Sequence, residues 1–532
     1  MTSLLSLSFL ALATAVSATA VSAADRPNVL FIAIDDLRND VGAFGAAHAK
    51  TPELDALAET ARVFTHHYVQ VPTCGASRCA LLRGRYPTEP VHRSNNAIRS
   101  THADWGARSL PAWFRRHGYR TLALGKITHH PGGLTGKHWA EGPEELPGAW
   151  DRCWIPDGPW KTPEAIMHGY ANGVARERGS SPPWEAFDGP DEAYPDAWVA
   201  AEAITTLQEL ADAGRPWFFG VGFFKPHLPF AAPKRWFELH AAGIPDLNPA
   251  VAARPPWPSG WHASGEFRKN YGHPSGRDPD TDADYARRMR RAYAASVSYM
   301  DAQLGRVLRA LRENGLEGNT VVVVWSDHGF LLGEHAIWGK HCLYEGALRS
   351  PLIIRHPGLS HPGVTSPAIV ESVDVFPTLA DLCGLPVPEG LDGRSLRPHL
   401  ADPAAPSGKA AHGFWTGGQR TVRTDRWRLI VQAANDGSVT RAELFDYRTD
   451  PEESRNHAMD HPEIVRELTN VLDRTPDRAR RNHAGDSAGR VRFGTSRNGT
   501  RRSGSSPELR GPSWASVTKE DSKNDHEETH HE

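Results

Sequence analysis

Short, continuous apolar runs, each followed at once by ionisable residues, constrain the fold of this 532-residue chain more than any other feature. The runs are rich in β-branched and aromatic residues and do not alternate with polar ones. This is the pattern of strands that are buried on both faces of a sheet. The sequence predicts four such strands, at residues 28–34, 121–124, 217–224 and 320–325.

Segments with a helical spacing of apolar residues separate these strands. The strongest segment, residues 285–313, keeps an apolar stripe along its length and ends at Asn314-Gly315, a common helix terminus. Buried strands that alternate with helices favour an α/β fold, a mostly parallel sheet with helices on both faces. The other predicted elements are helices at 51–64, 110–117, 197–213 and 374–382, a strand at 351–355, and long loops at 131–200 and 240–282.

Polar or ionisable side chains follow all four buried strands. A single Asp after a strand is usually a turn former or a helix cap, so the prediction depends on the four ends together. Because ligands of open parallel sheets bind at the carboxyl ends of the strands, we expect these residues to converge on one edge. They are Asp35, Asp36, Lys126, His129, Lys225, His227, Asp327 and His328.

Three of these residues are aspartates, and clustered carboxylates repel one another unless a cation or a proton intervenes. Asp35, Asp36 and Asp327 offer the hard oxygen ligands that Ca²⁺ and Mg²⁺ prefer, and His328 follows the third of them. The sequence therefore predicts a metal site at this edge of the sheet.

Residues 71–85 begin as a Pro-containing loop and continue as a run compatible with a helix. Cys74 and Arg78 are four residues apart, so one helical face can carry both. Side chains at a helix start lie beside unpaired backbone N–H groups, which favour anionic ligands. On these residues alone, Cys74 is a metal ligand, a thiolate nucleophile or a buried apolar residue.

The stretch Cys74-Gly75-Ala76-Ser77-Arg78, followed by Leu82-Arg83-Gly84-Arg85, resembles the signature of type I sulfatases. The resemblance extends over residues 26–472 and is nearest to the iduronate-2-sulfatase branch. It departs at Arg83, where the family usually has Thr. It departs again in residues 88–105, which border the pocket in the family and here contain His92-Arg93-Ser94-Asn95-Asn96. The other shared stretches are 28–38, 124–129, 225–229, 326–330, 333–335, 338–340 and 444–447.

This resemblance implies an alkaline-phosphatase-like fold and two non-standard components of the site. A formylglycine-generating enzyme would oxidise Cys74 to formylglycine, whose hydrated aldehyde is the nucleophile in the family. One Ca²⁺ per chain would be held by Asp35, Asp36, Cys74, Asp327 and His328.

The resemblance also implies roles for the remaining residues of the site. Arg78 and Lys126 would hold and polarise the hydrated formylglycine, and His129 would be the base that expels sulfate from the covalent sulfate hemiacetal. His227 and Lys340 would bind the sulfate and protonate the departing sugar oxygen. Spacing alone makes Lys340 a solvated loop lysine, and only the resemblance assigns it to the site. Weaker candidates for the cleft are Lys225, His130, His335 and His341.

Composition and the chain ends suggest an exported protein of two domains and a tail. Residues 1–24 resemble a secretory signal peptide with a small-x-small cleavage site, and their apolar run is too short to span a bilayer comfortably. We therefore expect a periplasmic or secreted protein that has no membrane attachment after cleavage. The predicted domains are a catalytic domain at 25–410, a small C-terminal α/β subdomain at 411–475 and a disordered tail at 476–532. Within the subdomain we expect antiparallel strands at 421–424, 427–432 and 443–447 and a helix at 464–472.

The cysteines and the net charge bear on disulfide bonds and on nucleic-acid binding. If modification consumes Cys74, four of the five cysteines remain, which permits disulfides in an oxidising compartment but assigns none. Cys383 resembles a buried small residue. The net charge of −3 gives no indication of nucleic-acid binding.

The leading hypothesis is a sulfatase that hydrolyses sulfate esters of a sulfated polysaccharide or oligosaccharide, with a 2-O-sulfated uronate as the candidate sugar. A phosphodiesterase or a phosphonate monoester hydrolase of the same superfamily is the alternative enzyme. Two-zinc phosphatases need more His and Asp ligands and normally a Ser or Thr nucleophile, so Cys74 argues against them. A sulfated-glycan binding protein with an unmodified cysteine is the alternative that is not an enzyme.

Overall fold

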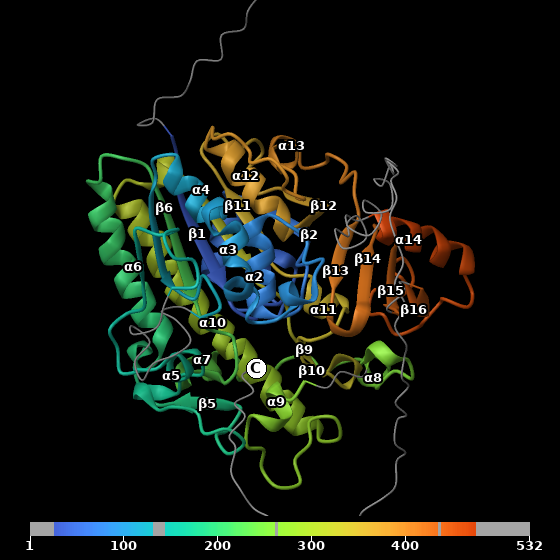
Figure 1. Cartoon of the computed structure of the whole chain (residues 1–532). Coiled ribbons are helices and arrows are strands. Elements are labelled where there is room, and N and C mark those ends of the chain that lie inside the picture. Colours follow the sequence, from blue (N-terminus) through green and yellow to red (C-terminus); the bar gives the residue numbers. More distant parts are fainter. Residues whose placement is uncertain (1–25, 131–143, 261–263, 435–437, 475–532) are drawn as a thin grey trace, which may run out of the picture. The chain divides into compact units, whose positions relative to one another are not determined.

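The computed structural model describes residues 26–130, 144–260, 264–434 and 438–474, and its centre is an eight-stranded sheet (Figure 1). The strand order is β12-β2-β11-β8-β1-β6-β3-β4. Only β11 runs antiparallel to its neighbours β8 and β2, so the predicted mostly parallel sheet is confirmed. The strands are β1 (Asn28–Ile34), β2 (Arg62–Tyr68), β3 (Arg120–Gly125), β4 (Arg152–Trp154), β6 (Trp217–Phe223), β8 (Thr320–Ser326), β11 (Leu352–Arg355) and β12 (Thr365–Glu371).

Helices cover both faces of the sheet and form two separate cores with it (Figure 1). Strand β1 shows the reason: Leu30 and Ile32 face the core that contains α6 and α10, whereas Val29 and Phe31 face the core that contains α2, α4 and α12. Alternate side chains point to opposite faces, so a strand without polar residues is buried on both. The helices are α2 (Cys74–Arg83), α4 (Leu110–Arg116), α6 (Pro195–Ala211), α10 (Ala283–Glu313) and α12 (Val375–Leu382).

The prediction of one helix over residues 51–64 is wrong. Helix α1 (Pro52–Ala58) ends early, and the chain turns at Thr60 into β2, which starts at Arg62. The Arg62 guanidinium is buried and donates to five backbone carbonyls, among them those of Ser360 and Leu400. These contacts with distant segments fix the extended conformation, and local helical spacing does not report them.

Further differences from the prediction concern strands and loops. The sequence did not predict β12, and the segments 131–200 and 240–282, predicted as long loops, contain short elements within their described parts. The remaining elements outside the C-terminal sheet are α3 (Ala97–Trp105), α5 (Pro163–Met167), α7 (Lys234–Leu239), α8 (Pro249–Ala252), α9 (Glu266–Lys269), α11 (Glu345–Leu348), α13 (Arg397–Ala401), β5 (Trp184–Phe187), β7 (Phe230–Pro233), β9 (Leu331–Leu332) and β10 (Trp338–Gly339).

A four-stranded antiparallel sheet forms the C-terminal part, as predicted, but it begins with a strand that the sequence did not indicate. Its helix packs on one face through Leu468 and Leu472. The elements are β13 (Ala411–Phe414), β14 (Gln419–Arg423), β15 (Trp427–Ala433), β16 (Val439–Asp446) and α14 (Pro462–Arg474). The predicted signal peptide at 1–24 and the predicted tail at 476–532 lie outside the described residues.

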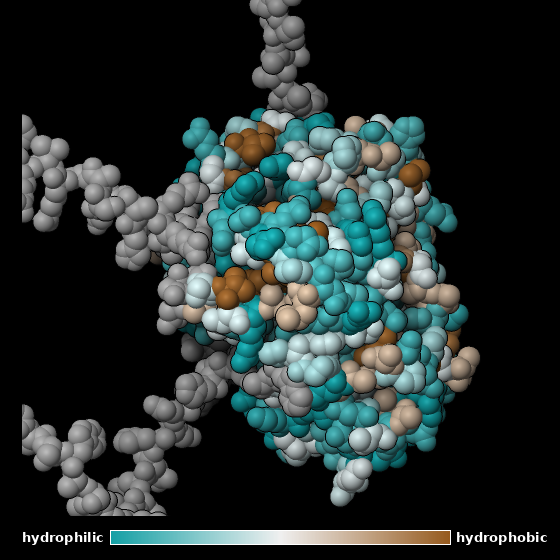
Figure 2. Space-filling model, turned by 90° about the vertical axis from the view of Figure 1, so that its right-hand side faces the viewer, coloured by the Kyte–Doolittle hydropathy of each residue, from teal (hydrophilic) through white to brown (hydrophobic). Residues whose placement is uncertain are grey.

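The described surface is mostly hydrophilic on the face shown in Figure 2, where apolar residues occur in small separate groups. Small scattered groups of exposed apolar side chains are normal for a folded protein and do not mark a binding surface. Among the described helices, none combines the length and the hydrophobicity that crossing a bilayer requires.

The site lies at the carboxyl ends of β1, β3, β6 and β8, which are neighbours in the sheet and run in parallel. Gly125 ends β3 with a positive φ of 72°, and a Cβ there would lie 2.2 Å from the carbonyl oxygen of Gly222. The missing side chain therefore lets residues 126–130 cross the end of β6 closely. This crossing brings the residues after β3 toward those after β1.

Candidate active site

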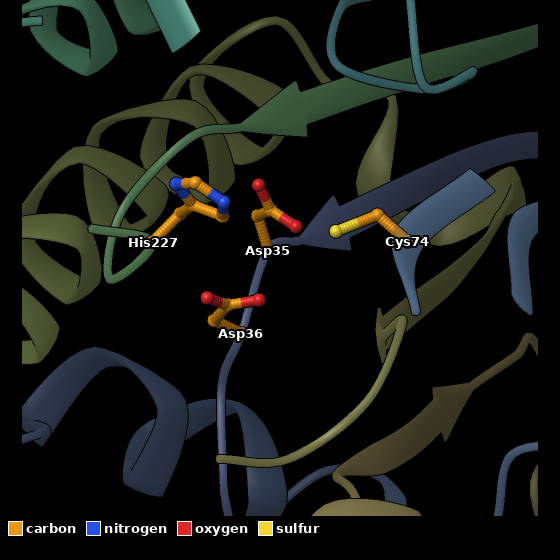
Figure 3. Close-up of side chains that lie close together, drawn as sticks. All are labelled: Asp35, Asp36, Cys74 and His227. Atoms are coloured by element: carbon orange, nitrogen blue, oxygen red, sulfur yellow. The ribbon is translucent and has the colours of Figure 1, made fainter. Parts of the chain in front are cut away.

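Acidic residues from two neighbouring strands and a cysteine from a helix start form one buried cluster. Asp35 and Asp36 follow β1, Asp327 and His328 follow β8, and Cys74 is the first residue of α2. Two overlapping groups have ligand atoms within 4.8 Å of one another: Asp35, Asp36, Cys74 and His227, and Asp35, Cys74, Asp327 and His328. In Figure 3 the four side chains of the first group point toward a common centre.

The cluster has the properties of a site for a hard divalent cation. Asp35 is 1% exposed, and its Oδ1 accepts no hydrogen bond from the described residues. A buried carboxylate oxygen without a hydrogen-bond donor is costly unless a cation satisfies it. The donors are mainly carboxylate oxygens, which suit Ca²⁺ or Mg²⁺.

Four basic side chains lie against these carboxylates. Burial by itself would raise the pKa of Asp35, but Lys126, His227 and Arg78 hold it well below its usual value. Burial has the larger effect on Asp36 and raises its pKa to about 7 although Lys340 opposes this. The pairs are Lys126 with Asp35, Arg78 with Asp327 at 2.8 Å, and Lys340 with Asp36 at 2.9 Å.

Cys74 lies between two side-chain nitrogen atoms. Its Sγ is 3.2 Å from Nε2 of His328 and 3.6 Å from Nζ of Lys340. Burial, with the nearby Asp35 charge adding to it, raises the pKa of this thiol well above its usual value. A thiol in such surroundings is protonated at neutral pH and is a poor nucleophile, because the thiolate is the reactive form.

Asn95 fixes the turn that presents Cys74. Its side-chain oxygen accepts hydrogen bonds from the Thr73 hydroxyl at 3.1 Å and from the Gly75 backbone N–H at 3.0 Å. A Cβ on Gly75 would lie 2.2 Å from the carbonyl oxygen of Asn95, so this position requires glycine. The segment 88–105 therefore does lie against the Cys74 turn, although nothing in the sequence identified Asn95 as its contact.

The two candidate histidines differ in their contacts. His129 is buried, and burial, followed by His130 and Lys126, lowers its pKa well below the usual value, so the ring is neutral. Its Nδ1 has no hydrogen-bond partner among the described residues. His227 is engaged on both nitrogens, with the Leu228 carbonyl at 2.7 Å and with Glu266 at 3.2 Å.

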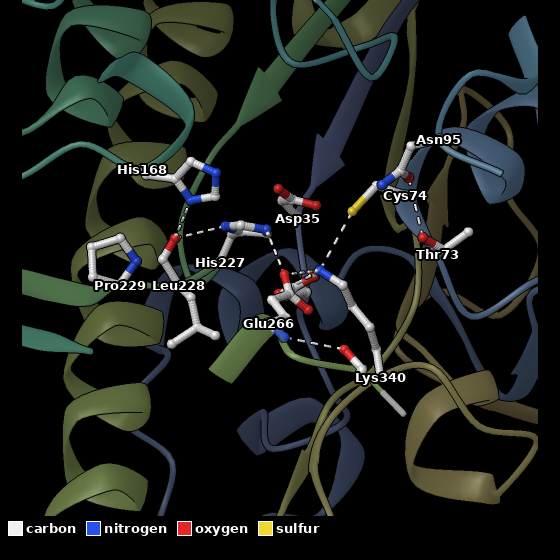
Figure 4. Close-up of polar contacts among 12 residues, drawn as sticks. Asp35, Thr73, Cys74, Asn95, His168, His227, Leu228, Pro229, Glu266 and Lys340 are labelled. Carbon is white, nitrogen blue, oxygen red and sulfur yellow. Dashed lines mark hydrogen bonds and ion pairs between the residues drawn. The ribbon is translucent and has the colours of Figure 1, made fainter. Parts of the chain in front are cut away.

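Glu266 is a residue of the site that the sequence analysis missed (Figure 4). It is the first residue of α9, in the segment 240–282 that was predicted as loop. Its Oε1 is 2.9 Å from Nζ of Lys340 and 3.2 Å from Nε2 of His227. No motif or periodicity surrounds it, so only the fold of this insert places it in the cleft.

Comparison with known proteins identifies the family. Residues 27–385 match the family described as Sulfatase. The chain belongs to the sulfatase family. Residues 333–478 also match the family described as N-sulphoglucosamine sulphohydrolase, C-terminal.

Individual relatives agree with this assignment. The chain is 31% identical over 428 residues to an iduronate 2-sulfatase of Mus musculus, covering 71% of this chain and 74% of the relative. It is 30% identical over 463 residues to a sulfatase of Formosa agariphila, covering 82% and 83%. The solved structure of a phosphonate monoester hydrolase from Silicibacter pomeroyi is 26% identical, with a TM-score of 0.63, and covers 85% of this chain and 96% of that one. The protein is thus a sulfatase with the alkaline-phosphatase-like fold.

The four residues that the sequence indicated as weaker candidates for the cleft lie in different surroundings. Lys225 donates to the carbonyl oxygens of His227 and Pro229, so it stabilises the loop rather than facing the cluster. His335 stacks on Tyr344 at the wall of a separate cavity of about 330 Å³. The last two candidates lie nearer the site: His341 is 3.3 Å from the Thr73 hydroxyl, and the ring of His130 lies 4.3 Å from that of His129.

Glu145 fixes the loop of His129 and makes the stability of this sulfatase dependent on pH. It accepts a hydrogen bond from the backbone N–H of His130 at 2.7 Å, and burial raises its pKa from 4.5 to about 7. Because the folded pKa is the higher one, the unfolded chain releases this proton first as the pH rises. The free energy of unfolding therefore falls between these two pKa values, by up to about 1.4 kcal/mol per pH unit, and Glu145 has no such effect below them.

Glu145→Gln is expected to remove this dependence while it keeps an acceptor for the His130 N–H. Urea unfolding of wild type and variant at about pH 5 and pH 7.5 measures it: the variant should lose less stability than wild type over this interval. Glu209→Gln, at an exposed position of α6, is the control and should keep the wild-type slope. Equal slopes in all three proteins would contradict the prediction.

Proposed function

We propose that this sulfatase removes sulfate from a sulfated polysaccharide or oligosaccharide by means of a formylglycine made from Cys74. The observation that carries the proposal is the environment of Cys74: a buried thiol with a raised pKa, 3.2 Å from His328 and 3.6 Å from Lys340. Burial keeps this thiol protonated although Lys340 opposes the rise of its pKa, and the ammonium group of Lys340 suits an oxygen nucleophile that develops negative charge. The hydrated aldehyde of formylglycine supplies that oxygen.

The residues that would hold a Ca²⁺ ion are Asp35, Asp36, Asp327, His328 and the modified side chain at position 74. The unsatisfied Oδ1 of Asp35 and the convergence of the ligand atoms within 4.8 Å support this set. The bound ion would neutralise the oxygens of the sulfate group.

The side chains around the cluster divide the remaining tasks. Arg78 and Lys126 are buried cations that orient the group at position 74 through their carboxylate partners. His129 is neutral and has an unoccupied Nδ1, which suits a base that accepts a proton when sulfate leaves. His227 and Lys340 would donate to the sulfate and protonate the departing sugar oxygen.

The relatives support the substrate class and the maturation partner. The chain resembles proteins named iduronate 2-sulfatase, which makes a 2-O-sulfated uronate the first sugar to test. The proposal requires a formylglycine-generating enzyme in the producing cell. It also places the mature protein outside the cytoplasm, in the periplasm or secreted, after removal of residues 1–24.

The test is sulfate release by protein coexpressed with a formylglycine-generating enzyme. Peptide mass spectrometry first confirms the aldehyde at position 74, and the sample is then assayed with Ca²⁺ on a panel of defined sulfated disaccharides. Release from the 2-O-sulfated uronate supports both the chemistry and the sugar. Release from another sugar keeps the chemistry and rejects the uronate, and no release from protein with a confirmed aldehyde rejects the proposal.

A phosphonate monoester hydrolase activity is the second candidate, because a solved enzyme of that name is 26% identical and covers 85% of this chain. Turnover of a phosphonate monoester and of a sulfate monoester by the same preparation separates the two functions. A higher kcat/KM for the phosphonate would make this candidate the main activity.

Binding of Ca²⁺ is expected to stabilise the folded protein. An ion that binds only the folded state adds about 2.7 kcal/mol to the free energy of unfolding at about 100 times its Kd. Asp327→Asn should abolish the increase in melting temperature that Ca²⁺ causes, whereas Asp188→Asn, at a side chain that is 88% exposed, should retain it. If Mg²⁺ but not Ca²⁺ raised the melting temperature, the ion of this site would be Mg²⁺. If neither ion raised it, the metal site would be rejected.

A further inference from the structure

Glu266 places a carboxylate between the two side chains that would bind the sulfate (Figure 4). The side chain is 12% exposed, and both of its ion pairs, with Lys340 and with His227, are made by the same oxygen, Oε1. Lys340 and His227 hold the pKa of Glu266 well below its usual value against the effect of burial, so the group is ionised. Glu266 is neither a ligand of the proposed metal ion nor one of the residues proposed to bind sulfate or transfer a proton.

The second oxygen of Glu266 differs from the first in its contacts. Oε2 is buried and accepts no hydrogen bond from the described residues. Buried carboxylate oxygens in folded proteins normally have a donor, and an unsatisfied one in a cleft marks a place where a bound water or a ligand supplies it. A carboxylate only accepts hydrogen bonds, so the missing group is a donor such as a hydroxyl.

The position of Glu266 relative to Cys74 limits which part of a substrate can supply this donor. Nζ of Lys340 is 2.9 Å from Glu266 Oε1 and 3.6 Å from Cys74 Sγ. A single ammonium group therefore separates the carboxylate from the reacting atom. The part of a sulfated sugar that lies at this depth is the alcohol that leaves, together with the substituents on its neighbouring carbon atoms.

We propose that Glu266 is a specificity-determining residue, whose free oxygen accepts a hydrogen bond from the hydroxyl next to the sulfated position of the sugar. This inference rests on the proposed sulfatase function and adds a requirement for the substrate. A substrate without that hydroxyl would leave the carboxylate unsatisfied in a buried site, and such sites reject deoxy analogues strongly. A second anionic group at the neighbouring carbon would be repelled.

The experiment compares three substrates with wild type and Glu266→Ala. They are a disaccharide with a terminal 2-O-sulfated uronate, its 3-deoxy counterpart, and 4-nitrophenyl sulfate, which carries no hydroxyl. Wild type should prefer the hydroxylated sugar over the 3-deoxy sugar by about 100-fold or more in kcat/KM, and the variant should lose this preference. 4-Nitrophenyl sulfate offers no hydroxyl to Glu266, so the change in its kcat/KM measures what the variant loses through Lys340 and His227, and the hydroxylated sugar should lose clearly more than this.

Two further variants keep the result interpretable. Lys269→Ala, at an exposed position of the same short helix, should behave as wild type with all three substrates. Glu266→Gln keeps the size of the side chain and removes its charge, so it shows whether an acceptor alone preserves part of the preference. Equal losses on the sugar and on the aryl sulfate, with a shifted pH profile, would overturn the proposal and make Glu266 a positioning residue for His227 and Lys340.

A binding measurement separates this inference from the proposed function. Calorimetry with Cys74→Ala, which does not turn over, compares the affinities for the hydroxylated and the 3-deoxy sugar with and without Glu266→Ala. If wild type releases no sulfate but the binding preference depends on Glu266, the proposed function fails and the inference holds. If the protein is active on sugars and shows no preference for the hydroxyl in either measurement, the inference fails and the function holds.

Discussion

Cys74→Ala is expected to lower kcat/KM for sulfate release by about 10⁴-fold or more, the loss that follows removal of a covalent nucleophile. The variant should fold, because position 74 is a tightly packed helix start with 1% exposure and alanine is smaller than cysteine. Sulfate release from the preferred disaccharide, measured beside the melting temperature, tests both statements.

Cys79→Ala is the matched control, since Cys79 is a buried cysteine of the same helix with the same exposure of 1%. Its Sγ contacts the Thr101 hydroxyl at 3.8 Å and no residue of the metal cluster among those described. This variant should retain activity within a few-fold of wild type. Substantial activity in Cys74→Ala would exclude position 74 as the nucleophile, and equal losses in both variants would indicate an effect of packing.

The ends of the central strands could be predicted from the sequence because their signal is local. A buried strand reads as an apolar run, and Asp35-Asp36 and Asp327-His328 interrupt two such runs abruptly. The parallel topology then follows from the alternation with helices, and it brings the strand ends to one edge of the sheet. The structure contains both the sheet and this gathering of side chains.

The missed features depend on contacts between distant segments. Strand β2 is held through Arg62 by carbonyls about 300 positions away in the sequence, and Asn95 reaches Cys74 through a turn without a motif. Glu266 lies in an insert without periodicity, so its place beside Lys340 follows only from how that insert folds. The resemblance covers motifs, and these residues lie between the motifs.

Arg428→Met is expected to lower the free energy of unfolding by about 3–5 kcal/mol, the usual result of removing one partner from a buried ion pair. Arg428 lies on β15 with no exposed surface, and its guanidinium pairs with Glu345 of α11 and, at 2.8 Å, with Glu453. It also donates to the Tyr447 hydroxyl at 2.9 Å. The methionine leaves the buried Glu453 without its cation and removes one of the arginines that pair with Glu345, which keeps Arg423 at 3.4 Å. It therefore weakens the contact between the C-terminal sheet and α11.

The size of this loss should depend on pH, and Arg426, which lies just before β15, provides the control. Burial already raises the pKa of Glu453 to about 7 against the effect of Arg428, and without this arginine the pKa values of Glu345 and Glu453 rise in the folded state, so protonation relieves more of the loss at about pH 5 than at about pH 8. Arg426 pairs with Asp446 at 2.7 Å but is 40% exposed, and Arg426→Met should cost about 1 kcal/mol or less at either pH. Urea unfolding of both variants measures these differences. A loss in Arg428→Met no larger than that in Arg426→Met would mean that the Coulomb attraction of the buried pair only offsets its desolvation, and that apolar packing holds the C-terminal sheet in place.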